Sequence, residues 1–232
     1  MTAQHLKEAI LGVDWAGLAT SFCDDADLAV RVQECNKRLA VWAGQIEQID
    51  AGNGALPFIR EMQRAGHYVA ALIALSMFRP AAASMRSSFE CSLYYSFFRH
   101  HPVELNTLAR SKEYYLKKDD VLTYFKAHIV GFAEKQAALS LLDRIKSWYS
   151  GTSAIVHGQV PGVWGGGTAL PEGGYDSGFA EVAIVHFEKC VSVVQDVFLC
   201  SMAEDVRAYF DPEAKKYILH GYSGAAKSAL GL

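Results

Sequence analysis

Residues 80–99 read PAAASMRSSFECSLYYSFFR, and this segment decides the fold class. Between Ala81 and Phe98 the only charged residues are Arg86 and Glu90, and most of the others are apolar or small. A helix that is apolar on all sides is typical of a central position in a bundle. Since Arg86 and Glu90 stand one helical turn apart, we expect them to pair with each other or with polar groups opposite.

The segments on either side of 80–99 repeat their apolar residues at steps of three and four, and alternation with a period of two is almost absent. The sequence therefore predicts an all-α fold, an antiparallel helical bundle around the 80–99 helix with additional N-terminal helices. The other expected helices cover residues 4–22 (one or two short helices), 24–50, 56–78, 103–117, 120–130, 132–157, 179–210 and 211–220.

Glycine-rich and proline-containing breaks divide the predicted helices into three groups. Residues 1–54, which end at the stop signal Ala-Gly-Asn-Gly, are expected to form N-terminal helices that pack on the bundle. Residues 55–210 are expected to form the bundle itself. Residues 211–232 begin with Asp-Pro and are expected to form a short helix followed by a loose tail.

The composition is that of a globular protein, with 51% hydrophobic and 20% charged residues in a chain of 232. The net charge of −3 supplies no overall basic field, so any RNA contact requires a local patch. The five cysteines contain no Cys-x-x-Cys motif and are expected to be free thiols in a reducing cytoplasm. Charged residues interrupt both the N-terminus and the apolar run 68–85, so we expect a cytoplasmic protein without a signal peptide or membrane span.

Residues 148–158, WYSGTSAIVHG, contain the main candidate site. On a helix, Ser150, Ser153 and His157 fall within roughly 60° of one another, and Gly158 is suited to the left-handed residue that ends a helix. A histidine in this position is either an acid/base group or a hydrogen-bonded core residue, and the sequence leaves both open.

A long glycine-rich loop follows His157. Residues 158–178 contain eight glycines together with Trp164, and loops of this length are usually functional or mobile. We expect this loop to be the most mobile or ligand-responsive internal segment. Ser150, Ser153 and Trp164 are the expected substrate-contacting residues.

The remaining polar groups also allow two interpretations. Arg86 suits phosphate or carboxylate binding, with Glu90 orienting it, but the two residues also suit a structural ion pair. His186 and Cys190 are four residues apart, yet no second ligand pair accompanies them, so neither a metal nor another cofactor is expected. Lysines, an arginine and tyrosines alternate over 110–126, which favours a solvated helix face over a surface that binds single-stranded nucleic acid.

Two motifs together resemble the HEPN-like superfamily of all-α bundles: Arg-x-x-x-Glu at 86–90 and Tyr-Ser-x-x-Ser-x-x-x-His-Gly at 149–158. The resemblance is to an uncharacterised prokaryotic branch and spans roughly residues 55–210. It implies an RNA-acting effector of a prokaryotic defence or toxin system and, more narrowly, a metal-independent ribonuclease. It also implies a homodimer or a component of a multi-protein complex.

By this resemblance His157 is the catalytic histidine. Arg86 and Glu90 are also candidate catalytic residues, and we expect them to lie close to His157 because charges on an apolar helix need polar partners nearby. The usual nuclease motif has an arginine separated from the histidine by four to six residues, and this chain has Ser150, Gly151 and Thr152 there. Either Arg86 supplies the cation from the neighbouring helix, or the chain is a non-catalytic HEPN-like module for dimerisation or sensing. Whether the protein is an enzyme therefore depends on the relative positions of Arg86 and His157.

Overall fold

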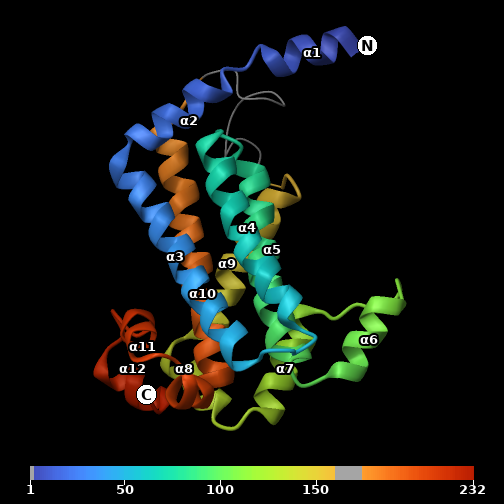
Figure 1. Ribbon diagram of the computed structural model, residues 1–232, viewed down its shortest axis with the longest axis vertical. Helices are drawn as coiled ribbons and strands as arrows, with labels where there is room; N and C mark the ends of the chain where they lie inside the picture. Colours follow the sequence, from blue (N-terminus) through green and yellow to red (C-terminus); the bar gives the residue numbers. More distant parts are fainter. Residues whose placement is uncertain (1–2, 160–173) are drawn as a thin grey trace.

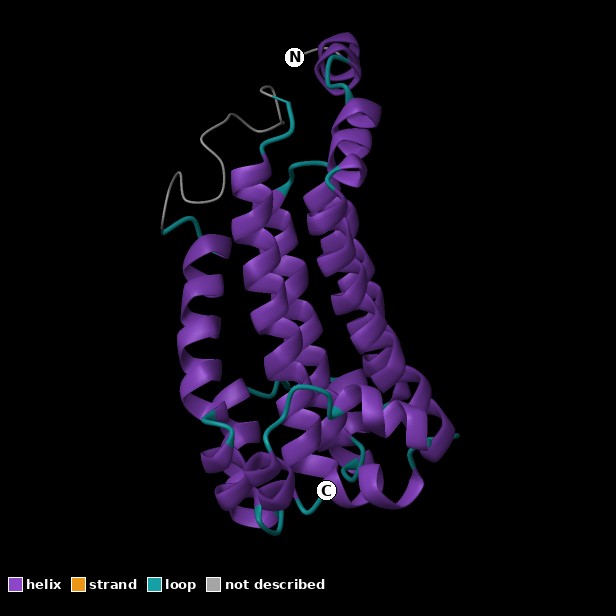
Figure 2. Ribbon diagram, turned by 90° about the vertical axis from the view of Figure 1, so that its left-hand side faces the viewer, coloured by secondary structure: helices purple, strands orange, loops and turns teal. Residues whose placement is uncertain are grey.

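The computed structural model describes residues 3–159 and 174–232, which form twelve helices and no strand (Figures 1 and 2). This confirms the all-α prediction. The helices are α1 (Ala3–Leu11), α2 (Trp15–Asp24), α3 (Ala26–Ile49), α4 (Leu56–Ala74), α5 (Phe78–Phe98), α6 (Pro102–Arg110), α7 (Lys118–His128), α8 (Phe132–Ala138), α9 (Leu141–Val156), α10 (Ser177–Tyr209), α11 (Pro212–Ile218) and α12 (Gly224–Leu230).

Five long helices, α3, α4, α5, α9 and α10, run along the length of the molecule (Figure 1). Helix α5 contacts α4, α9 and α10, which confirms the central position predicted for it. Its Phe89 and Tyr95 side chains are completely buried. The short helices α7, α8, α11 and α12 close one end of the bundle, whereas α1 and α2 lie at the other (Figures 1 and 2).

Helix α3 shares the same core although it precedes the predicted bundle region. Its Trp42 is completely buried, with ring centroids 5.0 Å from Phe198 and 5.4 Å from Phe210. Asp25 caps the helix by accepting a hydrogen bond from the Leu28 amide. The packed core is therefore continuous across residue 54. Within the described residues, no helix combines the length and apolar character needed to cross a bilayer.

The single helix predicted for 132–157 is wrong, because the structure has two helices there. Ser140 takes left-handed backbone angles (φ 50°, ψ 34°) between α8 and α9. No glycine or proline marks this break in the sequence. The turn accompanies the burial of Phe132 and Leu141, and it lets α8 contact α10 and α12, so tertiary packing determines it.

The predicted loose tail after residue 220 is also wrong. Residues 224–230 form α12, whose Ala226 amide donates a hydrogen bond to the Ser223 side chain. Leu230 is only 2% exposed, so it anchors the helix on the closed end of the bundle. The buried leucine, the serine cap, and the hydrogen bond from Tyr222 to Asp196 of α10 together order this segment.

Candidate functional site

The predicted pairing of Arg86 with Glu90 is confirmed on the outer face of α5. Arg86 Nε donates to Glu90 Oε1 over 2.8 Å, and the two side chains are 27% and 31% exposed. Burial lowers the pKa of Arg86, but the hydrogen bond and charge of Glu90 outweigh this effect and raise it above its ordinary value. The Arg86 guanidinium is therefore charged, and both side chains are reachable from solvent.

His157 follows the last turn of α9 and lies beside this pair. Gly158 has φ 69°, which confirms the predicted left-handed helix end. His157 Nε2 is 3.4 Å from Arg86 Nη1, so the predicted proximity of the two residues is also confirmed. Since a guanidinium only donates, this contact fits a neutral imidazole with its proton on Nδ1 and an acceptor lone pair on Nε2.

Tyr149, the first residue of the 149–158 motif, connects the groups of the site. Its hydroxyl donates to Glu90 Oε1 over 2.6 Å, and the Arg86 guanidinium lies 4.8 Å from its ring centroid. Burial and the hydrogen bond to Glu90 raise the pKa of Tyr149, so the phenol remains a donor. Its position two turns before His157 was the available signal. The α5–α9 cluster, as we name it, comprises Arg86, Glu90, Tyr149 and His157.

Two further cations border the α5–α9 cluster. Arg79 Nη2 donates to the Val156 carbonyl oxygen over 3.0 Å and thereby holds the turn that carries His157. Lys118, at the start of α7, places its ammonium 5.2 Å from the Tyr149 ring centroid and also pairs with the exposed Asp119. The cluster therefore lies among positively charged side chains from two helices, α5 and α7.

Two of the expected substrate-contacting residues, Ser150 and Ser153, do not bind the α5–α9 cluster through their side chains. Ser150 is exposed on α9, and neither its side chain nor that of Ser153 hydrogen-bonds to Arg86 or His157, although the Ser153 carbonyl oxygen accepts from the His157 amide over 2.9 Å. Ser153 Oγ is buried and makes no hydrogen bond within the described part of the chain. Trp164, with residues 160–173 of the predicted mobile loop, lies outside the described residues.

His186 and Cys190 each have a partner other than a metal. His186 Nε2 lies 2.6 Å from Thr152 Oγ1, and Cys190 Sγ donates to the Met85 carbonyl oxygen over 3.3 Å. Burial and, to a lesser extent, the charge of Lys189 lower the pKa of His186 to about 4. Across residues 3–159 and 174–232, no three histidine, cysteine or carboxylate side chains are grouped as metal ligands would be.

Comparison of the chain with protein-family models, curated proteins and solved structures gives no significant match. The HEPN-like resemblance therefore depends on the two motifs alone.

Proposed function

We propose that the α5–α9 cluster cleaves RNA without a metal ion, as the HEPN-like resemblance implies. The observation that supports this most is the 3.4 Å contact between Arg86 Nη1 and His157 Nε2 at a solvent-reachable surface. The guanidinium of Arg86 is permanently charged and suits the phosphate of a phosphodiester, and the neighbouring imidazole suits removal of a proton from the adjacent hydroxyl.

In the proposed reaction Arg86 binds the scissile phosphate and stabilises the charge that develops on it. When Arg86 Nη1 turns from His157 to the phosphate, it frees the lone pair of His157 Nε2. That nitrogen then takes the proton of the adjacent 2′-hydroxyl, and the 2′-oxygen forms a bond to phosphorus. The bond from phosphorus to the 5′-oxygen breaks, and the departing oxygen takes a proton from water. The products are a 2′,3′-cyclic phosphate and a 5′-hydroxyl.

The other groups position this pair. Glu90 orients Arg86 by accepting a hydrogen bond from Arg86 Nε. Tyr149 in turn orients Glu90, because its hydroxyl donates to the same carboxylate oxygen. Arg79 lies beside the last turn of α9 and Lys118 lies over the ring of Tyr149. In the proposed complex these two cations contact phosphates on either side of the scissile one.

A second candidate function is the non-catalytic module for dimerisation or sensing. The observation that favours it is the pairing of Arg86 with Glu90, which Tyr149 also satisfies, because a completed ion pair suits a structural role. In that case the exposed His157 contributes to the surface alone, and its replacement leaves every activity of the protein unchanged.

The two candidates are separated by incubating the protein with total RNA and with tRNA, each with and without EDTA. We expect the wild type to cleave in EDTA and His157→Ala to lose cleavage. His220→Ala is the matched control, because His220 is an exposed histidine just after α11. Equal activity of both variants, or none in the wild type, favours the non-catalytic module.

A further inference from the structure

A groove of about 530 Å³ lies between α9 and α10 and is separate from the α5–α9 cluster. Its apolar lining comes from Trp148, Val185 and Val193. The polar lining consists of Arg144, Ser147, His186, Glu188, Lys189 and Ser192. Sites for small organic molecules commonly have volumes of roughly 300–1,000 Å³ and combine an apolar wall with a few convergent polar groups.

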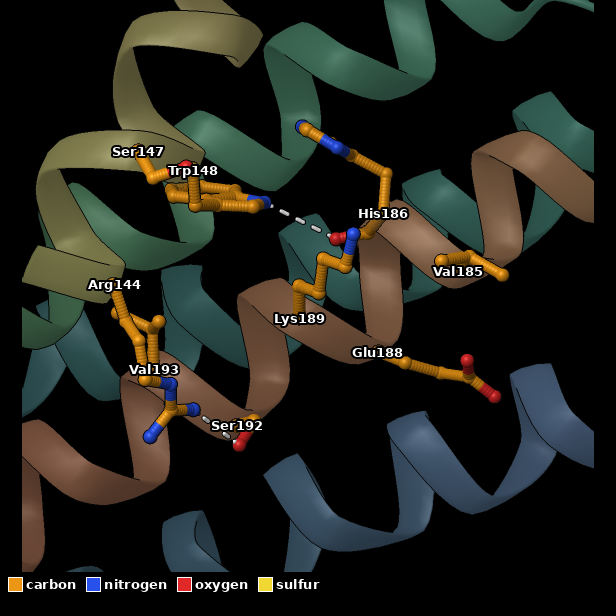
Figure 3. A pocket seen from close by; sticks show the side chains of 9 residues that line it. All are labelled: Arg144, Ser147, Trp148, Val185, His186, Glu188, Lys189, Ser192 and Val193. Atoms are coloured by element: carbon orange, nitrogen blue, oxygen red, sulfur yellow. Dashed lines mark hydrogen bonds between the residues drawn. The ribbon is translucent and has the colours of Figure 1, made fainter. Parts of the chain in front are cut away.

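The two cations of the groove come from opposite helices. Figure 3 shows Arg144 and Trp148 on α9 facing Lys189 and Ser192 on α10, whereas Glu188 points away from them. Glu188 is bound by Arg31 of α3, with two hydrogen bonds of 2.7 and 2.8 Å. Lys189 is exposed and has no carboxylate within ion-pairing distance among the described residues. Positive charge therefore remains available in the groove.

Hydrogen bonds to two residues of α10 hold the Arg144 guanidinium in place. Its Nη1 donates to Asp196, whose side chain is 1% exposed and also accepts from the Tyr222 hydroxyl. Its Nη2 donates to Ser192 Oγ over 2.7 Å, which leaves the serine proton available to a ligand. The Arg144 side chain is nevertheless 38% exposed, so the guanidinium is both fixed and accessible. A preorganised cation binds an anion without the entropic cost of ordering it.

We propose that the groove binds a small organic phosphate of mononucleotide size. Arg144, Lys189 and the two serine hydroxyls supply donors for a phosphate dianion from both walls. The volume exceeds what a lone phosphate requires, and the apolar lining by Trp148 and Val185 suits a flat, weakly polar group. The inference depends on this groove alone and holds whether or not the α5–α9 cluster cleaves RNA.

The test measures the binding of AMP, adenosine and inorganic phosphate by calorimetry and by the indole N–H signals of the tryptophans. We expect AMP to bind at least tenfold more tightly than adenosine or phosphate. We also expect AMP to shift the Trp148 signal and not that of Trp42, which is completely buried in the core. Equal binding of phosphate or of adenosine, or an unmoved Trp148 signal, overturns the proposal.

A charge-matched pair of variants locates the effect in the groove. Lys189→Met removes an exposed ammonium that lines the groove, and we expect it to weaken AMP binding at least tenfold. Lys146→Met removes a charge that is also exposed, from α9 outside the groove lining, and we expect less than a twofold change. Arg144 is left intact, because its loss would strand the buried Asp196. Equal effects of the two variants contradict the proposal.

Discussion

Arg86 Nη1 lies 3.4 Å from His157 Nε2, although the two residues are 71 positions apart in the chain. They meet because α9 runs back along α5, which brings the end of α9 to the first turns of α5 (Figure 1). Arg79, one residue after the start of α5, completes the arrangement by binding the Val156 carbonyl. Under the proposed function, Arg86 takes the part of the arginine that the usual nuclease motif carries close to its histidine.

Tyr149→Phe tests whether the hydroxyl on Glu90 positions Arg86. The ring remains, but Glu90 loses its 2.6 Å donor. We expect the free energy of unfolding to fall by at most about 1 kcal/mol, since the site is partly exposed, while RNA cleavage falls further than this loss explains. Urea unfolding and cleavage rates are measured side by side. Tyr115→Phe, at a tyrosine that is 66% exposed, should change neither.

The sequence predicted the parts of this site that depend on local helix patterns, and it did not predict the parts that depend on how the helices pack. Arg86, Glu90 and His157 stand on strongly periodic helices with recognisable ends, so their proximity was predictable from helix faces and from the cost of burying charge. Tyr149 was missed as a polar group because an aromatic residue at that spacing normally belongs to the core. No local sequence pattern indicates the ion pair between Arg144 and Asp196, because that pair depends on how α9 packs against α10.

The features of the fold also differ in whether the local sequence or long-range packing determines them. Helix content followed from periodicity, whereas the break at Ser140 and the helix 224–230 depend on packing between segments far apart in sequence. The apolar residues of 68–98 and 182–200 are mostly buried within the chain.

Self-association remains a prediction, and α1 is the surface through which we expect it. None of its side chains is buried, and Leu6 and Leu11 are 60% and 69% exposed. We expect a homodimer at micromolar concentration by light scattering, and a shift to monomer in the double variant Leu6→Ser, Leu11→Ser. A wild type that is strictly monomeric contradicts the prediction.

Arg99→Ala should destabilise the fold strongly. Arg99 and Asp50 are 12% and 9% exposed in their side chains and are joined over 2.6 Å, so the substitution leaves a buried carboxylate without its cation. We expect a loss of about 3–5 kcal/mol in urea unfolding. Arg60→Ala breaks the exposed pair with Glu47 and should cost less than about 1 kcal/mol. Similar losses in the two variants would contradict the assignment.

Stability should fall as the pH is lowered through the range set by His186. Burial lowers its folded-state pKa from 6.5 to about 4, so between these values the unfolded chain binds a proton that the folded chain excludes. The contribution of neutral His186 to the free energy of unfolding is complete above about pH 6.5 and is lost toward pH 4. The loss amounts to about 2 kcal/mol between pH 7 and pH 5. Between pH 7 and pH 5, the free energy of unfolding should fall by about 2 kcal/mol less in His186→Gln than in the wild type, as measured by urea unfolding at both pH values. An unchanged pH dependence in the variant refutes the assignment.

Product analysis on a short RNA that the protein cleaves tests the central claim most directly. In EDTA, the wild type should yield a 2′,3′-cyclic phosphate and a 5′-hydroxyl. Cleavage should disappear when the 2′-hydroxyl at the cut position is removed, and it should fall by about 10²–10⁴-fold in His157→Ala. Cleavage that requires a metal ion, survives the 2′-deoxy substitution, or is unchanged in His157→Ala would contradict the proposed role of the Arg86–His157 pair.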